Sequence, residues 1–216
     1  MKKKFLVPFL ILSGFYAILY FWNKEEKKAE QHPTIHDSAA KPDDYLMEAI
    51  DYEDMHRHDK SAYSIEQAIQ AIWKLEKDVD DASFDHLEEA IEKLEEVHRK
   101  LIRDSIPSTE LLKAFEFALG NLAFAELEVA EKYSESNQLK EGRSALRYAQ
   151  LHIKNALILH SPDIPEDSAL LASEVHLLDE MDSLLSQEDM SHEAYTQALD
   201  KMLKEVDQII SNIDKD

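Results

Sequence analysis

The chain has 216 residues, a formal net charge of −21, 44% hydrophobic and 32% charged residues, and no cysteine. The lack of cysteine excludes disulfides, thiolate metal sites and cysteine nucleophiles, and the hydrophobic content excludes a fully disordered chain. Only three glycines interrupt a sequence dominated by Leu, Ala, Glu and Lys, which are good helix formers because they lose little rotamer freedom in a helix. The composition therefore predicts an all-α fold.

The charge is unevenly distributed along the chain. Residues 1–28 contain six Lys and two Glu, whereas the remainder contains 18 basic and 43 acidic residues, a net charge of −25. A body this acidic repels phosphate backbones and anionic lipid headgroups, so nucleic acid is a poor candidate partner. The negative charge serves either solubility or the attraction of cations and basic partners.

The first predicted element is a single transmembrane helix. After three lysines, residues 5–22 form an uncharged run of 18 residues with Tyr16, Tyr20 and Trp22 toward its far end. Such a run is about 27 Å long as a helix, close to the roughly 30 Å of a hydrocarbon core, and the aromatic residues are typical of a membrane interface. A cleaved signal peptide is the alternative, but no A-x-A cleavage pattern follows. We predict an uncleaved anchor over residues 1–28, flanking charges included.

The charges beside this anchor give its expected orientation. Three lysines and the α-amino group precede the span and three lysines follow it, so the positive-inside rule slightly favours a cytoplasmic N-terminus. We therefore expect a single-pass membrane protein whose C-terminal domain is extracytoplasmic, on the periplasmic side of a bacterial inner membrane. Residues 29–43 contain two prolines and show no apolar periodicity, which is typical of a linker.

From Tyr45 onward, apolar residues recur at helical spacing and predict an acidic all-helical domain over residues 44–216. We expect a helical-hairpin bundle or array of about seven helices. Ser83 is the expected N-cap of the third predicted helix, residues 84–103. The fourth predicted helix, residues 109–135, is apolar almost all round, so other helices should cover it on several sides. Gly120 would allow one of these helices to approach closely. The predicted helices cover residues 44–58, 62–79, 84–103, 109–135, 139–160, 166–186 and 192–213.

The hairpins contain a possible internal repeat. Residues 83–94 align with residues 191–202 at a constant offset of 108, with matching Ser, Ala and Lys and agreeing apolar positions. This pattern indicates either duplicated hairpins or convergent helix patterning.

Two family resemblances follow from these hairpins. The spacing of Leu87, Ala90, Ile91 and Leu94 behind a short loop resembles the second helix of a tetratricopeptide hairpin, although that family's first-helix signature is absent. The hairpins over 62–103 and 166–213 are similar in layout to YfdX-type bacterial exported helical proteins. These resemblances imply protein binding or an undefined envelope role, and they supply no functional residues.

The sequence contains few chemical motifs. Its isolated glycines exclude a phosphate-binding loop, and neither a Gly-x-Ser-x-Gly nor a His-Glu-x-x-His motif occurs. A di-metal carboxylate site needs inward-facing Glu-x-x-His pairs, and Glu53/His56 and Glu95/His98 are the two candidates. About one such pair is expected by chance in a chain this rich in Glu and His. Glu95 also flanks the apolar stripe, and His98 suits a cation at a helix C-terminus.

These observations predict no catalytic residues, no cofactor and no metal, with Glu53, His56, Glu95 and His98 kept as metal candidates. His152, which shares a helix side with alanines, is expected to be a hydrogen-bonded core histidine. The leading functional hypothesis is a non-enzymatic, membrane-anchored helical scaffold or protein-binding module. Its expected partners are the membrane, through residues 5–22, and other proteins. The alternatives are a metal-binding helical bundle and an accessory subunit of a membrane complex.

Overall fold

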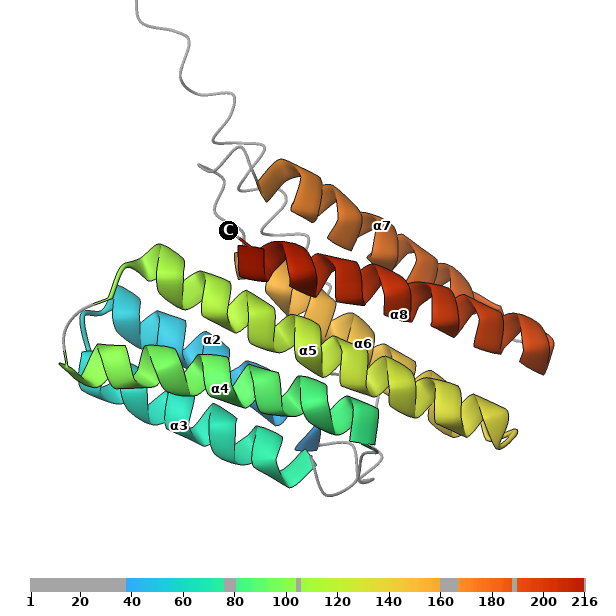
Figure 1. Ribbon diagram of the computed structural model, residues 1–216, viewed down its shortest axis with the longest axis horizontal. Coiled ribbons are helices and arrows are strands. Elements are labelled where there is room, and N and C mark those ends of the chain that lie inside the picture. Colours follow the sequence, from blue (N-terminus) through green and yellow to red (C-terminus); the bar gives the residue numbers. More distant parts are fainter. Residues whose placement is uncertain (1–37, 76–80, 104–105, 160–166, 188–189, 216) are drawn as a thin grey trace, which may run out of the picture. The chain divides into compact units, whose positions relative to one another are not determined.

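A computed structural model describes residues 38–75, 81–103, 106–159, 167–187 and 190–215. These residues form seven helices and no strand (Figure 1), which confirms the predicted all-α class. The predicted anchor over residues 1–28 and most of the predicted linker lie outside the described residues. The helices are α2 (Lys41–Asp54), α3 (His58–Leu75), α4 (Asp81–Arg103), α5 (Ser108–Glu135), α6 (Leu139–Leu159), α7 (Asp167–Ser186) and α8 (His192–Lys215).

The helical domain begins earlier than the sequence suggested. Helix α2 begins at Lys41 rather than at residue 44, and Asp43 is buried within its first turn. Pro42 is compatible with this position, because the first N–H groups of a helix have no intrahelical partner and the proline ring already has a helical φ. Helix α2 therefore includes the last three residues of the predicted linker, residues 41–43.

The two serines that the repeat equates have different roles. Helix α4 begins at Asp81, so Ser83 lies inside the helix and is not its N-cap as predicted. Its hydroxyl instead donates a 2.6 Å hydrogen bond to the Glu128 carboxylate on α5. Ser191 does cap its helix, since its hydroxyl accepts from the Ala194 N–H at 3.3 Å.

Helices α2 and α5 both end in a left-handed residue that reverses the chain. His56 has φ 55° and Asn137 has φ 59°. At each end the following N–H bonds back five residues, from Arg57 to the carbonyl of Tyr52 and from Gln138 to that of Tyr133, each at 2.8 Å. This pattern satisfies the last free carbonyls of a helix. His56 therefore has a backbone role in the turn between α2 and α3.

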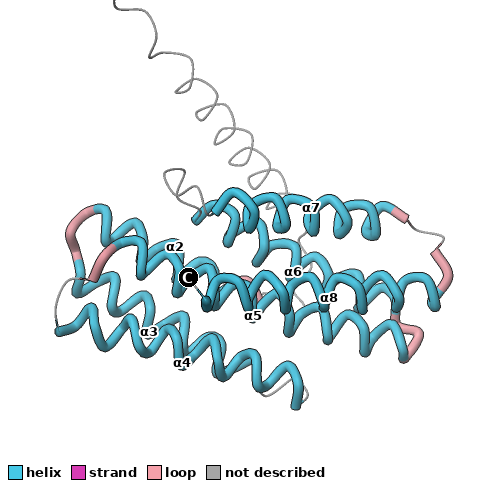
Figure 2. Tube along the Cα trace, turned by 45° about the horizontal axis from the view of Figure 1, so that its top comes forward, coloured by secondary structure: helices cyan, strands magenta, loops and turns pink. Residues whose placement is uncertain are grey.

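Helix α5 is the central element of the domain. It packs against α4, α6 and α8 (Figure 1), as the all-round apolar pattern predicted. One core cluster joins α2, α3 and α4 mainly to one face of α5, and a second joins α6, α7 and α8 to another. Both views place α3 and α7 on opposite sides of α5 (Figures 1 and 2). Most large apolar residues of α5 are buried, whereas Leu112, Phe124 and Val129 are half-buried.

Candidate functional site

An open groove of about 1130 Å³ lies between α4, α5 and α8. Helices α4 and α8 both pack on α5, but they make few contacts with each other. The space between them therefore stays open above α5. Its lining consists of Asp85, His86, Glu89, Glu92, Lys93, Glu95, Glu96 and Arg99 from α4, Phe117, Phe124 and Glu128 from α5, and Asp207, Ile210 and Ser211 from α8.

The floor of the groove is aromatic and ordered by a buried amide. The rings of His86 and Phe124 stack with centroids 3.7 Å apart. Asn121 is fully buried, and its Nδ2 donates to the Phe117 carbonyl at 3.0 Å. This orientation leaves its Oδ1 to accept from Nδ1 of His86, at 2.7 Å. The amide thus holds the imidazole over Phe124 and fixes the shape of the floor.

The walls of the groove are strongly acidic. Seven carboxylates face it against two cations. Both cations are engaged: the Lys93 ammonium lies 5.5 Å above the Phe117 ring, and Arg99 pairs with Glu95 at 3.2 Å. Within the described part of the chain, four of the carboxylates make no hydrogen bond or ion pair. These four are Asp85, Glu89, Glu92 and Asp207.

A second polar cluster is buried between α2, α5 and α6. Nδ1 of His152 donates to Oδ1 of Asp43 at 2.7 Å, and Nδ2 of Asn155 donates to Oδ2 of the same carboxylate at 2.6 Å. His152 is fully buried, which confirms the predicted hydrogen-bonded core histidine. These residues do not line the groove between α4, α5 and α8. Their geometry indicates that they fasten α2 to α6.

The charges in this cluster are mutually dependent. Burial lowers the pKa of His152, but the charge and hydrogen bond of Asp43, together with the charge of Glu126, outweigh that effect and raise the pKa. Burial raises the pKa of Glu126 to about 7, while His152 acts in the opposite direction and Asp43 in the same one. Within this cluster, the raised pKa brings the titration of Glu126 near neutral pH.

The structure places the four metal candidates in ordinary surface roles. Glu53 accepts from Nδ1 of His58 at 2.9 Å, and the exposed His56 occupies the left-handed turn. Glu95 pairs with Arg99 along α4, and His98 is half-buried. Among the described residues, none of the four belongs to a group of three ligand atoms close enough to share one ion.

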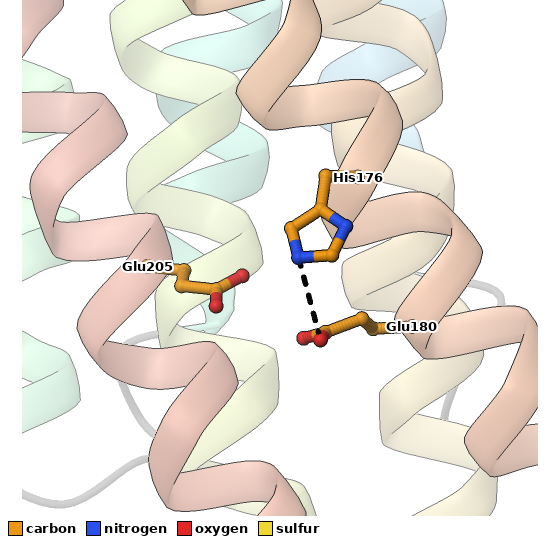
Figure 3. A group of neighbouring side chains, drawn as sticks. All are labelled: His176, Glu180 and Glu205. Atoms are coloured by element: carbon orange, nitrogen blue, oxygen red, sulfur yellow. Dashed lines mark ion pairs between the residues drawn. The ribbon is translucent and has the colours of Figure 1, made fainter.

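A different group of that kind lies between α7 and α8. His176, Glu180 and Glu205 place one ligand atom each within 4.8 Å of one another (Figure 3). Nε2 of His176 lies 3.5 Å from the Glu180 carboxylate. The Lys201 ammonium already bridges the two carboxylates, contacting Glu180 closely and Glu205 at 3.2 Å. The group is partly exposed, and the single positive charge of Lys201 offsets part of its negative charge, so we interpret it as an interhelical ion-pair network.

Sequence reasoning did not identify the groove. The signal that points to it was the pair Phe117 and Phe124, seven residues apart on a helix apolar on every side. Of the two repeat segments, only residues 83–94 contribute to the lining, because the α8 residues that line the groove follow residue 202.

No helix among the described residues is both long and apolar enough to cross a membrane. In comparisons with known proteins, the chain matches no family model, no curated protein and no solved structure.

Proposed function

We propose that this chain is a non-enzymatic protein-binding module, held at a membrane through residues 5–22, and that it binds its partner in the groove between α4, α5 and α8. The observation that carries this proposal is the combination of an aromatic floor with four carboxylates that have no partner in the described residues. Concave surfaces that combine apolar side chains with a few placed polar groups are typical of recognition sites.

The groove is also unlike a solvated helix face. A face that only confers solubility has no need of an ordered floor, whereas the buried Asn121 amide positions His86 on Phe124. Side chains that are fixed before binding lose less conformational entropy when a partner arrives. This pre-organisation supports a binding role.

Site-directed photo-crosslinking in the native membrane tests the location of the binding site. A photoreactive residue at Glu92, in the groove wall, should give a discrete crosslinked product. The same residue at Glu66, exposed on α3 and outside the groove, should not. Crosslinking should be lost when Phe124→Ala removes the floor contact. Equal products from both positions would place binding elsewhere.

The membrane role rests on the uncharged run of residues 5–22. Removal of residues 1–24 should release a folded, strongly helical protein from the membrane fraction. A reporter that is active only outside the cytoplasm, fused after Asp216, should be active. Activity of a cytoplasmic reporter in its place would reverse the proposed orientation.

A further inference from the structure

We infer that the occupant of the groove between α4, α5 and α8 is an amphipathic helix with lysine or arginine on both flanks. This inference rests on the proposed function and names the chemistry of its partner. It follows from the geometry of the walls, the half-buried His86–Phe124 stack and the charges that lack partners in the described residues.

The walls favour a helical rather than an extended partner. The part of the chain that the structure describes contains no strand, so the groove offers no sheet edge whose backbone groups could pair with an extended peptide. A helix brings its backbone hydrogen bonds with it. The lining of α4 runs from Asp85 to Arg99, about 21 Å at 1.5 Å per residue, which matches a helix of about four turns.

The apolar surface that the floor offers lies around Phe124. Phe117 is buried beneath the Lys93 ammonium, and Ile210 is buried where α8 approaches Gly120 so closely that a Cβ there would lie 2.9 Å from its Cγ1. The half-buried rings of His86 and Phe124 stack at the groove. The apolar stripe of an amphipathic helix would lie over this stack.

The charges require cations on the partner. Asp85, Glu89 and Glu92 form one row along α4, and Asp207 lies on the α8 side. Covering these carboxylates with an apolar or acidic surface would remove them from water without a counter-charge, which is costly. Lysine or arginine on both flanks of the incoming helix would supply that counter-charge. A second copy of this body, with a net charge of −25 over residues 29–216, would be repelled.

A synthetic peptide tests the inference on the full chain held in uncharged detergent micelles, with empty micelles as the blank. The probe is a fluorescent helix of about 15 residues with a leucine stripe and lysine flanks. Fluorescence anisotropy should show saturable binding. Amide substitution of Asp85, Glu89 and Glu92 should weaken binding about tenfold or more. The matched control is the amide substitution of three exposed carboxylates outside the groove, Asp51, Glu66 and Glu88, which should change binding less than about twofold.

Two further peptides separate charge from helicity. A peptide with the same leucine stripe but glutamate flanks should not bind, and one with lysine flanks and a central proline should bind at least about tenfold more weakly. Raising the salt from roughly 0.05 M to roughly 0.5 M should weaken binding of the first peptide. Equal binding of all three peptides, or unchanged binding by the groove variant with an intact helical circular dichroism spectrum, would overturn the inference.

Failure of this inference can be distinguished from failure of the proposed function. If crosslinking at Glu92 yields a groove-specific product while the lysine-flanked peptide does not bind, the groove binds a partner of different chemistry and only this inference fails. If crosslinking at Glu92 matches that at Glu66, the groove is not the binding site and both fail.

Discussion

His152 and Asp43 lie 109 residues apart in the sequence, yet Nδ1 of His152 donates a 2.7 Å hydrogen bond to Oδ1 of Asp43 in the interior of the domain. The same carboxylate accepts from Asn155. One side chain at the start of α2 is thus bound twice by α6. Because the contact connects α2 to α6, it secures the first described helix to the rest of the bundle.

Replacing Asp43 should therefore destabilise the protein strongly. Asp43→Ala would leave the buried imidazole of His152 without its counter-charge, and loss of one partner from a buried pair costs about 3–5 kcal/mol. Asp51→Ala, at an exposed position on the same helix, should change the free energy of unfolding by less than about 0.5 kcal/mol. Urea denaturation of both variants at neutral pH measures the difference. Equal midpoints would show that the pair contributes nothing.

The same cluster should make the protein more stable at mildly acidic than at alkaline pH. The pKa of Glu126 is raised from 4.5 to about 7 by burial, and that of His152 is raised above 6.5 by Asp43 and Glu126 against the effect of burial. A group whose pKa is higher in the folded than in the unfolded protein stabilises the fold at pH values below its unfolded-state pKa. This stabilisation is lost as the pH rises through the folded-state pKa. The stabilisation that Glu126 contributes is thus lost between pH 4.5 and about 7.

Glu126→Gln separates this contribution from the rest of the molecule. The variant should be more stable than the wild type at pH 8, by up to about 3 kcal/mol, because no buried carboxylate has to ionise. The free energies of unfolding of the two proteins should converge below pH 4.5, the ordinary pKa of this carboxyl group. Free energies of unfolding at several pH values test this. Parallel curves would show that Glu126 does not titrate in this range.

Two glycines at close helix contacts should respond differently to alanine. A Cβ on Gly142 would lie 2.9 Å from the backbone carbonyl oxygen of Ala130, whereas one on Gly120 would meet the side chain of Ile210 at the same distance. Alanine adds about 1 kcal/mol of helix propensity at either site. A backbone atom cannot move aside as a side chain can, so Gly142→Ala should be the more destabilising by about 1–3 kcal/mol. Thermal unfolding of the pair measures this difference, and an equal or opposite order would contradict the close α5–α6 packing.

Two phenylalanines on α5 should differ in their effect on stability. Phe115 is fully buried, and Phe115→Ala should cost about 3–5 kcal/mol because it leaves a cavity. The all-round apolar pattern of this helix predicted burial for Phe124 as well, but Phe124 is half-buried and lines the groove. Phe124→Ala should cost less, about 1–2 kcal/mol. Denaturant titration of both variants tests this order, and equal losses would mean that the groove is closed in solution.

The Glu95/His98 pair should be dispensable for stability. Glu95 makes a half-exposed ion pair with Arg99, and such pairs contribute about 0–1 kcal/mol. Replacing both Glu95 and His98 with glutamine should therefore have an effect of that size. Metal analysis of protein purified without chelator provides the control. A stoichiometric transition metal that the double variant loses, together with several kcal/mol of stability, would favour the metal-binding alternative.

The sequence alone was sufficient for the local features of this protein. Helix-forming composition and apolar periodicity predicted the all-α class and most helix positions, because both depend on residues within a few turns of one another. The all-round apolar pattern of α5 correctly indicated neighbours on several sides, and the position of His152 among alanines correctly indicated a buried histidine. Helix starts were less predictable, since Pro42 and Asp43 are compatible with a linker as well as with a first turn.

Only the tertiary structure decided which distant side chains meet. Helical spacing places Glu95 and His98 on neighbouring positions of one helix, but it does not indicate what lies opposite, and Glu95 pairs with Arg99 instead. No local pattern could link Asp43 to His152. The groove, in turn, exists because α4 and α8 each pack on α5 while making few contacts with each other. Exposure of Phe124 follows from that gap between neighbours, which is set by helix packing and not by the apolar pattern of α5 itself.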